Sequence, residues 1–178
     1  MASTFINEFK VVLEQGGIVL WLMTLLSITL YTLLTSTWLV LRSVQKQFLS
    51  VQEQISEMSD PQLVEDEVYL FELDEISWVR RRLPVLSVLL ALSPLSGLLG
   101  TVSGMLNTFA GLSSASTAKP IDSISSGISE ALVTTQVGLL IAIPGAFLYA
   151  FIRRKLDKVT EQLHQTASQH IIQIKKAS

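Results

Sequence analysis

The sequence contains no cysteine and only two histidines, and only 16% of its 178 residues are charged. Without cysteine the chain can form no disulfide, thiolate nucleophile or cysteine-ligated metal site. His164 and His170 lie six residues apart on a predicted polar helix, and we interpret them as solvent-facing or stalk residues. No nucleophile accompanies a base, and no glycine-rich loop is followed by lysine. We therefore expect no enzyme activity, no cofactor, no metal and no nucleic-acid partner.

Apolar residues, in contrast, make up 49% of the chain, and they gather in long runs. Residues 18–41 carry no charge, and the 22 residues from 131 to 152 would span roughly 33 Å as a helix. A third apolar run extends from residue 83 to residue 110 and includes Pro84 and Pro94, which membrane helices can accommodate. The first sixteen residues lack the positive region of a cleavable signal, so we expect the first run to be an anchor.

These patterns predict an all-α integral membrane protein with three transmembrane helices that extend into a cytoplasmic helical bundle. The predicted organisation is as follows: an amphipathic periplasmic segment (1–16), transmembrane helix 1 (17–41), a cytoplasmic helical segment (42–82), transmembrane helix 2 (83–110), a periplasmic loop (111–125), transmembrane helix 3 (126–152) and a cytoplasmic C-terminal helix (153–178).

The distribution of lysine and arginine predicts the orientation. One side of the three spans carries Arg42, Lys46, Arg80, Arg81, Arg82, Arg153, Arg154, Lys155 and Lys158. The other side carries Lys10 and Lys119. Because cytoplasmic flanks are enriched in positive charge, we expect the N-terminus outside and the C-terminus inside.

Two stretches outside the apolar runs carry apolar residues at steps of three and four. One runs from Leu41 to Met58 and the other from Leu156 to Ile174. Such a stripe needs a helical neighbour to cover it, so the two stretches are predicted to pair. Between them, Asp60 and Pro61 indicate the end of one helix, and Pro61 is also a candidate start of the next. The acidic and then basic segment that follows is either a solvated face or a binding surface.

Small residues form matching stripes on the second and third spans. They are Gly97, Gly100, Gly104, Gly127 and Gly138, and Pro144 lies further along the third span. Because small residues let helix backbones approach closely in lipid, we expect these stripes to pack helices, including those of neighbouring subunits.

The third span also carries Glu130, Thr134 and Thr135, which are polar groups in an otherwise apolar segment. An ionisable residue within a membrane is costly to bury and suggests a role in moving protons or ions. In the alternative interpretation, Glu130 reaches the outer interface and the threonines bond to carbonyls of their own helix. The residue types alone leave both interpretations open.

Two segments together resemble the paired transmembrane signature of the ExbB/TolQ/MotA proton-channel family, nearest to the ExbB type. They read SPLSGLLGTVSGMLNTF and ISSGISEALVTTQVGLLIAIPGAFLYAFIRRKLD. The resemblance covers residues 94–157 and implies an inner-membrane subunit in an oligomeric ring, a homopentamer. It also implies two copies of an ExbD-type single-span partner inside the ring, each with an intramembrane aspartate.

By the same resemblance, proton flow would drive motion that a TonB-type protein passes to outer-membrane transporters, as in iron uptake. Thr101, Glu130 and Thr135 match the polar pore positions of the family, and we expect them to line the proton pathway together with Thr134. Thr134 and Gln136 stand where the ExbB pattern more often has small apolar residues, and the segment between spans one and two is shorter than in well-known members. A TolQ-like role in envelope maintenance and a passive membrane scaffold are the alternative hypotheses.

Overall fold

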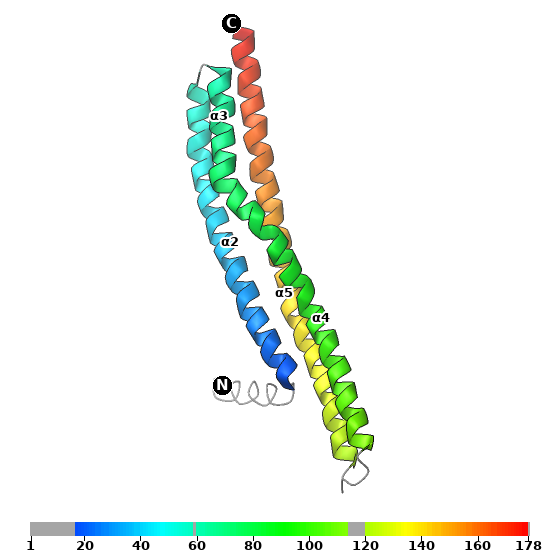
Figure 1. The fold of residues 1–178 in the computed structure, drawn as a ribbon. Helices are drawn as coiled ribbons and strands as arrows, with labels where there is room; N and C mark the ends of the chain where they lie inside the picture. The colour runs from blue at the N-terminus through cyan, green and yellow to red at the C-terminus, as the bar shows by residue number, and fades with distance from the viewer. Residues whose placement is uncertain (1–16, 59, 114–119, 178) are drawn as a thin grey trace. The chain divides into compact units, whose positions relative to one another are not determined.

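The computed structural model describes residues 17–58, 60–113 and 120–177, and all regular structure in these ranges is helical. Helix α2 spans Gly17–Glu57, α3 spans Pro61–Phe71 and α4 spans Ser77–Ser113, with the π-helix η1 (Glu72–Ile76) between α3 and α4 (Figure 1). Helix α5 spans Pro120–Ala177. The predicted N-terminal amphipathic segment and residues 114–119 of the predicted loop lie outside the described residues.

Three helical stretches are long and apolar enough to cross a membrane: Gly17–Ile55, Pro61–Ser113 and Ile124–Lys176. A span needs only about 20 residues, so each stretch also extends beyond the hydrocarbon. The prediction of an all-α protein with three membrane-spanning helices is therefore confirmed. The orientation and the ring remain predictions.

The start of α3 follows from its first residues. Asp60 is the N-cap, and its side chain accepts a hydrogen bond of 2.9 Å from the backbone N–H of Gln62. Pro61 occupies the first turn, where its missing N–H costs no helical hydrogen bond. Further on, the Ser77 hydroxyl donates to the Glu72 carbonyl at 3.0 Å, at the end of the π-helical turn.

The chain divides into two compact units, and α2, α4 and α5 each contribute to both. The described part of the first unit comprises residues 17–31, 88–113 and 120–146. That of the second unit comprises residues 32–58, 60–87 and 147–177.

In the first unit, α5 packs against both α2 and α4. A Cβ atom placed on Gly138 would lie 3.1 Å from Met23 Cε on α2 and 2.9 Å from the Ser93 carbonyl oxygen on α4. Two turns later, a Cβ atom on Gly145 would lie 3.4 Å from Leu30 Cδ2. The glycines of α5 therefore provide the room in which its two neighbours approach.

In the second unit, the two predicted apolar stripes are buried together with one side of α3 and α4. The fully buried side chains of this core include Leu41, Val44, Ile55, Val64, Ile76, Val79, Ile152, Leu156 and Leu163. Lys155 Nζ on α5 donates to Gln45 Oε1 on α2 at 3.0 Å, and His170 Nε2 lies 2.8 Å from the Met58 carbonyl oxygen. These contacts confirm that the two stripe-bearing stretches pair.

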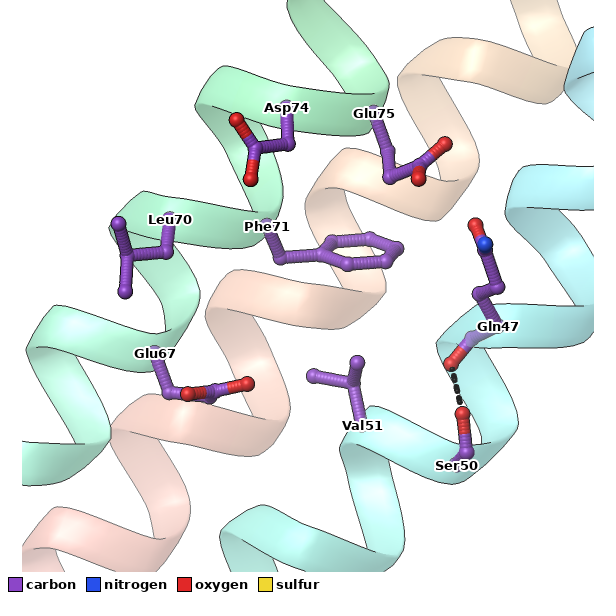
Figure 2. A pocket seen from close by; sticks show the side chains of 8 residues that line it. All are labelled: Gln47, Ser50, Val51, Glu67, Leu70, Phe71, Asp74 and Glu75. Atoms are coloured by element: carbon purple, nitrogen blue, oxygen red, sulfur yellow. Dashed lines mark hydrogen bonds between the residues drawn. The ribbon is translucent and has the colours of Figure 1, made fainter.

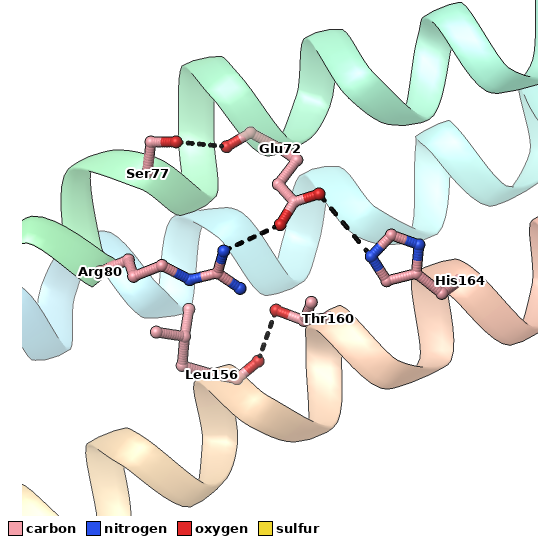
Figure 3. Close-up of polar contacts among 6 residues, drawn as sticks. All are labelled: Glu72, Ser77, Arg80, Leu156, Thr160 and His164. Atoms are coloured by element: carbon pink, nitrogen blue, oxygen red, sulfur yellow. Dashed lines mark hydrogen bonds and ion pairs between the residues drawn. The ribbon is translucent and has the colours of Figure 1, made fainter.

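Charged groups bridge the helices of the second unit at their surface. Arg80 Nη1 donates to Glu72 Oε1 at 3.0 Å, and His164 Nε2 of α5 lies 3.6 Å from Glu72 Oε2 (Figure 3). The Arg80 and His164 side chains are more than half exposed, so water screens both pairs. Each pair contributes at most about 1 kcal/mol, and the buried core supplies most of the stabilisation.

Candidate functional site

Glu130 of α5 lies where three helices of the first unit meet. Its Oε2 accepts a hydrogen bond of 3.1 Å from Asn107 Nδ2 on α4. On its other side is Gly17, the first residue of α2, where an added Cβ atom would lie 2.7 Å from Glu130 Oε1. The carboxylate thus lies at the N-terminal end of α2, where the helix dipole favours a negative charge.

Gly17 is suited to this position for a second reason. Its φ angle is +59°, a left-handed conformation that glycine adopts more readily than other residues. A side chain at this position would meet both backbone strain and the Glu130 carboxylate. The start of α2 and the position of Glu130 therefore depend on each other.

The sequence analysis did not identify Asn107. The residue is a lone amide in the mostly apolar stretch of α4, and a polar group at that depth needs a partner. An amide on one span and an acid on the next suggest a hydrogen bond between the two spans. Pairing Asn107 with Glu130 nevertheless requires the register of α4 against α5.

Thr134 is fully buried inside the single chain. Its hydroxyl lies 3.0 Å from the Glu130 carbonyl oxygen and 3.1 Å from that of Ala131, both on its own helix. Its side chain also occupies the space where a Cβ atom of Gly100 would be. In this structure Thr134 therefore contributes to the α4–α5 contact.

Thr135, the next residue, is half-buried. Its hydroxyl lies 3.2 Å from the Ala131 carbonyl oxygen on α5 and 3.4 Å from the Gly97 carbonyl oxygen on α4. The hydroxyl thus has acceptors on two helices while part of the side chain remains accessible.

Thr101 on α4 is also half-buried, and its hydroxyl donates to the Leu98 carbonyl at 2.7 Å. None of the hydrogen bonds recorded for the described residues joins Thr101 to Glu130 or Thr135. The structure therefore joins Glu130 to Asn107 by a hydrogen bond, whereas the hydroxyl of Thr101 bonds within its own helix.

The predicted small-residue stripes face each other within one chain. Gly97 approaches the backbone of Thr134 and Thr135, and a Cβ atom on Gly104 would lie 2.5 Å from the Gly127 carbonyl oxygen. Gly127 in turn approaches Thr108. These glycines lie at contacts between α4 and α5 inside the chain, and packing against neighbouring subunits stays a prediction.

Pro144 is exposed on α5, and it cannot supply the backbone N–H of a regular helical turn. Near this position, the Tyr31 hydroxyl on α2 donates to the Ile141 carbonyl at 3.1 Å. The carbonyl that Pro144 leaves without its helical donor is that of Leu140, so the Tyr31 hydrogen bond links α2 to α5 at the next carbonyl and does not replace the bond lost at the proline.

Together, these residues place a carboxylate and hydroxyl groups on membrane helices but provide no metal site. No cluster of three or more potential metal-binding side chains occurs among the described residues. A carboxylate and hydroxyls can exchange protons or hydrogen-bond to an acid on another helix, which is the chemistry of a proton path.

A groove of about 370 Å³ lies in the second unit, between α2 and the α3–η1 segment (Figure 2). Three carboxylates, Glu67, Asp74 and Glu75, line it around the apolar side chains of Leu70 and Phe71. One side of the groove is formed by the acidic segment, which we interpreted from the sequence as either a solvated face or a binding surface. Nothing in the groove identifies a ligand.

Comparison with known proteins gives a family match. The family model of the MotA/TolQ/ExbB proton channel family matches residues 39–165, which is more than half of the chain. The matched range includes the glycines at the α4–α5 contact as well as Glu130, Thr134 and Thr135.

Among individual relatives, the chain is similar to the Tol-Pal system protein TolQ of Haemophilus influenzae, with 34% identity over 87 residues. It is 35% identical over 82 residues to the biopolymer transport protein ExbB of Salmonella typhimurium, and 39% identical over 83 residues to the putative biopolymer transport protein ExbB-like 3 of Synechocystis sp.. These matches cover 49%, 46% and 46% of this chain, but only 38%, 33% and 39% of the respective relatives.

Proposed function

Because the chain belongs to the MotA/TolQ/ExbB proton channel family, we propose that it is an ExbB-like proton-channel subunit of the bacterial inner membrane. In this proposal it works with an ExbD-type single-span partner and uses the proton motive force to energise TonB-dependent transport across the outer membrane. Iron-siderophore uptake is an example of such transport. The similarity to a relative named ExbB supports the proposal.

The observation that carries the proposal is the position of Thr135. Its hydroxyl lies at the α4–α5 contact and has carbonyl acceptors on both helices, yet the side chain is only half-buried. A hydroxyl in that position can donate to, or accept from, a carboxylic acid on a third helix. Such an acid is the intramembrane aspartate expected of the ExbD-type partner.

Thr101 and Glu130 complete the proposed proton path. Thr101 offers a second half-buried hydroxyl, on α4. Glu130 offers a carboxylate that is half-buried and has one recorded donor, Asn107. We assign Thr134 to helix packing, since its hydroxyl bonds within its own helix and its side chain is fully buried.

The proposed assembly is a homopentamer around two copies of the partner. In the single chain, large apolar side chains remain exposed on the membrane stretches of α4 and α5. They include Leu95, Leu98, Leu106, Phe109, Leu132, Leu140 and Phe147. Lipid, neighbouring subunits and the partner helix would cover these side chains in the ring.

Two isosteric substitutions at adjacent positions test the proposed path. We expect Thr135→Val to abolish energy-dependent uptake while the protein still assembles, because valine keeps the shape but removes the hydroxyl. Thr134→Val is the matched control and should retain uptake. The measurement is transport of a labelled siderophore in cells that lack the native gene, with the amount of protein in the membrane determined alongside. Normal uptake by Thr135→Val would contradict an essential role for that hydroxyl.

A TolQ-like role in envelope maintenance is the second candidate, favoured by the similarity to a Tol-Pal system protein at 34% identity. A deletion strain separates the two candidates. Poor growth under iron limitation supports the ExbB-like role, whereas detergent sensitivity with normal iron-limited growth supports the TolQ-like role. In either case the same residues would form the proton path.

A further inference from the structure

Two aromatic side chains in the second unit each lie beside a cation one helical turn further along. Trp38 and Arg42 are four residues apart on α2, and Phe151 and Lys155 are four residues apart on α5. Arg42 Cζ lies 5.1 Å from the centroid of the Trp38 ring, and Lys155 Nζ lies 4.9 Å from the same centroid. The centroids of the Trp38 and Phe151 rings are 5.0 Å apart. The two pairs therefore lie side by side and form one cluster.

The cluster has positive charge without a negative partner. Lys155 Nζ donates to Gln45 Oε1, which is a neutral acceptor, and it also lies 5.4 Å from the centroid of the Phe151 ring. Within the described ranges, no carboxylate lies within ion-pair distance of Arg42 or Lys155. Both cations lie close to the ring of the same Trp38 side chain, and an anion beside this ring could form charge-assisted hydrogen bonds with them.

The position of the cluster along the helices indicates where such an anion would come from. Trp38 and Phe151 lie in the last turns of the apolar stretches, and the first charges after them are Arg42 and Arg153. Tryptophan at such a boundary is typical of the membrane–water interface. The cations of the cluster are therefore at the level of lipid headgroups.

Exposed apolar side chains adjoin the cluster: Leu39 lies between Trp38 and Arg42 in sequence, and Phe147 lies one turn before Phe151. Leu39 on α2 is 58% exposed, and Phe147 on α5 is 75% exposed. Phe151 itself is 47% exposed. A ligand at this position would therefore meet cations at one end and exposed hydrocarbon at the other, which matches a phospholipid better than a free anion or an acidic peptide.

We propose that Trp38, Arg42, Phe151 and Lys155 form a binding site for the phosphate headgroup of an anionic phospholipid. Arg42 and Lys155 bind the phosphate, the two rings hold the cations in place, and the acyl chains lie along Leu39 and Phe147. This site is separate from the proposed proton path, so its test does not depend on the proposed function.

Native mass spectrometry of the full chain, purified in mild detergent and stripped of lipid, tests the site. Phosphatidylglycerol, phosphatidylcholine and inorganic phosphate are added separately at matched concentrations. We expect the variant Arg42→Gln/Lys155→Gln to bind phosphatidylglycerol at least about tenfold more weakly than the unaltered protein. Phosphatidylcholine, which has no net charge, should bind weakly to both proteins.

The matched control is Lys46→Gln/Lys158→Gln, which removes two exposed cations one turn further along the same helices. It should retain phosphatidylglycerol binding within about twofold, as should the charge-preserving variant Arg42→Lys/Lys155→Arg. If the Gln variant and the control lose phosphatidylglycerol binding equally, the proposal is overturned, because the lipid would then bind through the general positive charge of the surface. Equal binding of both lipids, displacement of the lipid by inorganic phosphate, or loss of binding in the charge-preserving variant would also overturn it.

Discussion

At the scale of single residues, adjacent positions on α5 have different environments. Thr134 is fully buried, whereas Thr135 is half-buried and reaches a carbonyl on α4. Consecutive helical residues are rotated by about 100°, so the two threonines meet α4 differently: Thr134 packs against Gly100, and Thr135 lies at the edge of the same contact, near the Gly97 carbonyl. The Thr134 side chain is therefore enclosed within the chain, whereas the Thr135 side chain stays partly accessible, as the proposed contact with a partner helix requires.

Glu130 and Asn107 can be tested as an interacting pair. Asn107→Leu and Glu130→Met each remove one partner of the 3.1 Å hydrogen bond while keeping the side chain similar in size. We expect each single variant to lower the free energy of unfolding by about 1 kcal/mol, since it removes a hydrogen bond that joins α4 to α5. The measurement is denaturant unfolding of the purified protein in detergent micelles.

The double variant provides the control for this pair. Because both partners become apolar, we expect it to be more stable than the sum of the single effects predicts, by about 1 kcal/mol. Glu130→Met also removes the negative charge near the start of α2, and that part of the loss should persist in the double variant. Strictly additive effects would show that the hydrogen bond contributes nothing to stability.

At the scale of helices, the glycines of α4 and α5 determine how closely the two helices pack. Gly100 lies against the side chain of Thr134, and Gly104 lies against the backbone at Gly127. Where lipid gives no hydrophobic drive for association, such close contact is a main source of helix–helix affinity. A larger residue on this stripe must therefore separate the helices or distort them.

We predict that Gly100→Val destabilises the protein by about 1–3 kcal/mol or more, because the new side chain would occupy the space of Thr134. Leu99→Val is a suitable control, since Leu99 is adjacent in sequence and exposed. Its effect should stay within about 0.5 kcal/mol. Thermal unfolding in micelles, followed by circular dichroism, compares the two variants. If Gly100→Val is as stable as Leu99→Val, the prediction is wrong, and the α4–α5 contact accommodates a larger side chain at Gly100.

The sequence predicted these elements better than it predicted their partners. Spacings of three and four residues were sufficient to identify the apolar stripe from Leu41 and the glycine stripes, because a helix places such residues on one face. The same spacings do not show which helix lies opposite. The glycine stripes were therefore assigned partly to neighbouring subunits, although the structure pairs them within one chain.

The site was predicted only in part for a similar reason. Glu130 was identified because an acid in an apolar stretch is unusual. Its partner Asn107 was not identified, since pairing them requires the register of α4 against α5. The different environments of Thr134 and Thr135 depend on the rotation of α5, which composition and spacing do not determine.

At the scale of the whole molecule, the single chain leaves much of its apolar membrane surface uncovered. In the proposed ring, copies of the chain and a partner helix share this surface with lipid. The polar groups of one chain also provide no complete proton path by themselves, since no recorded hydrogen bond connects Thr101 with Thr135 or Glu130 in the described ranges. The proposed function therefore requires a partner that brings an acid to these groups.

The composition of the complex is the decisive prediction at this scale. After co-expression with neighbouring genes and purification in mild detergent, native mass spectrometry should find five copies of this chain with two copies of a single-span protein. That partner should carry an aspartate within its membrane helix, and replacing the aspartate with asparagine should abolish transport without changing the mass of the complex. A dimer of this chain, or a ring that never contains an acidic helix, would leave the proton path without its carrier. The scaffold hypothesis would then be preferred, because it requires only the helical stretches outside the membrane.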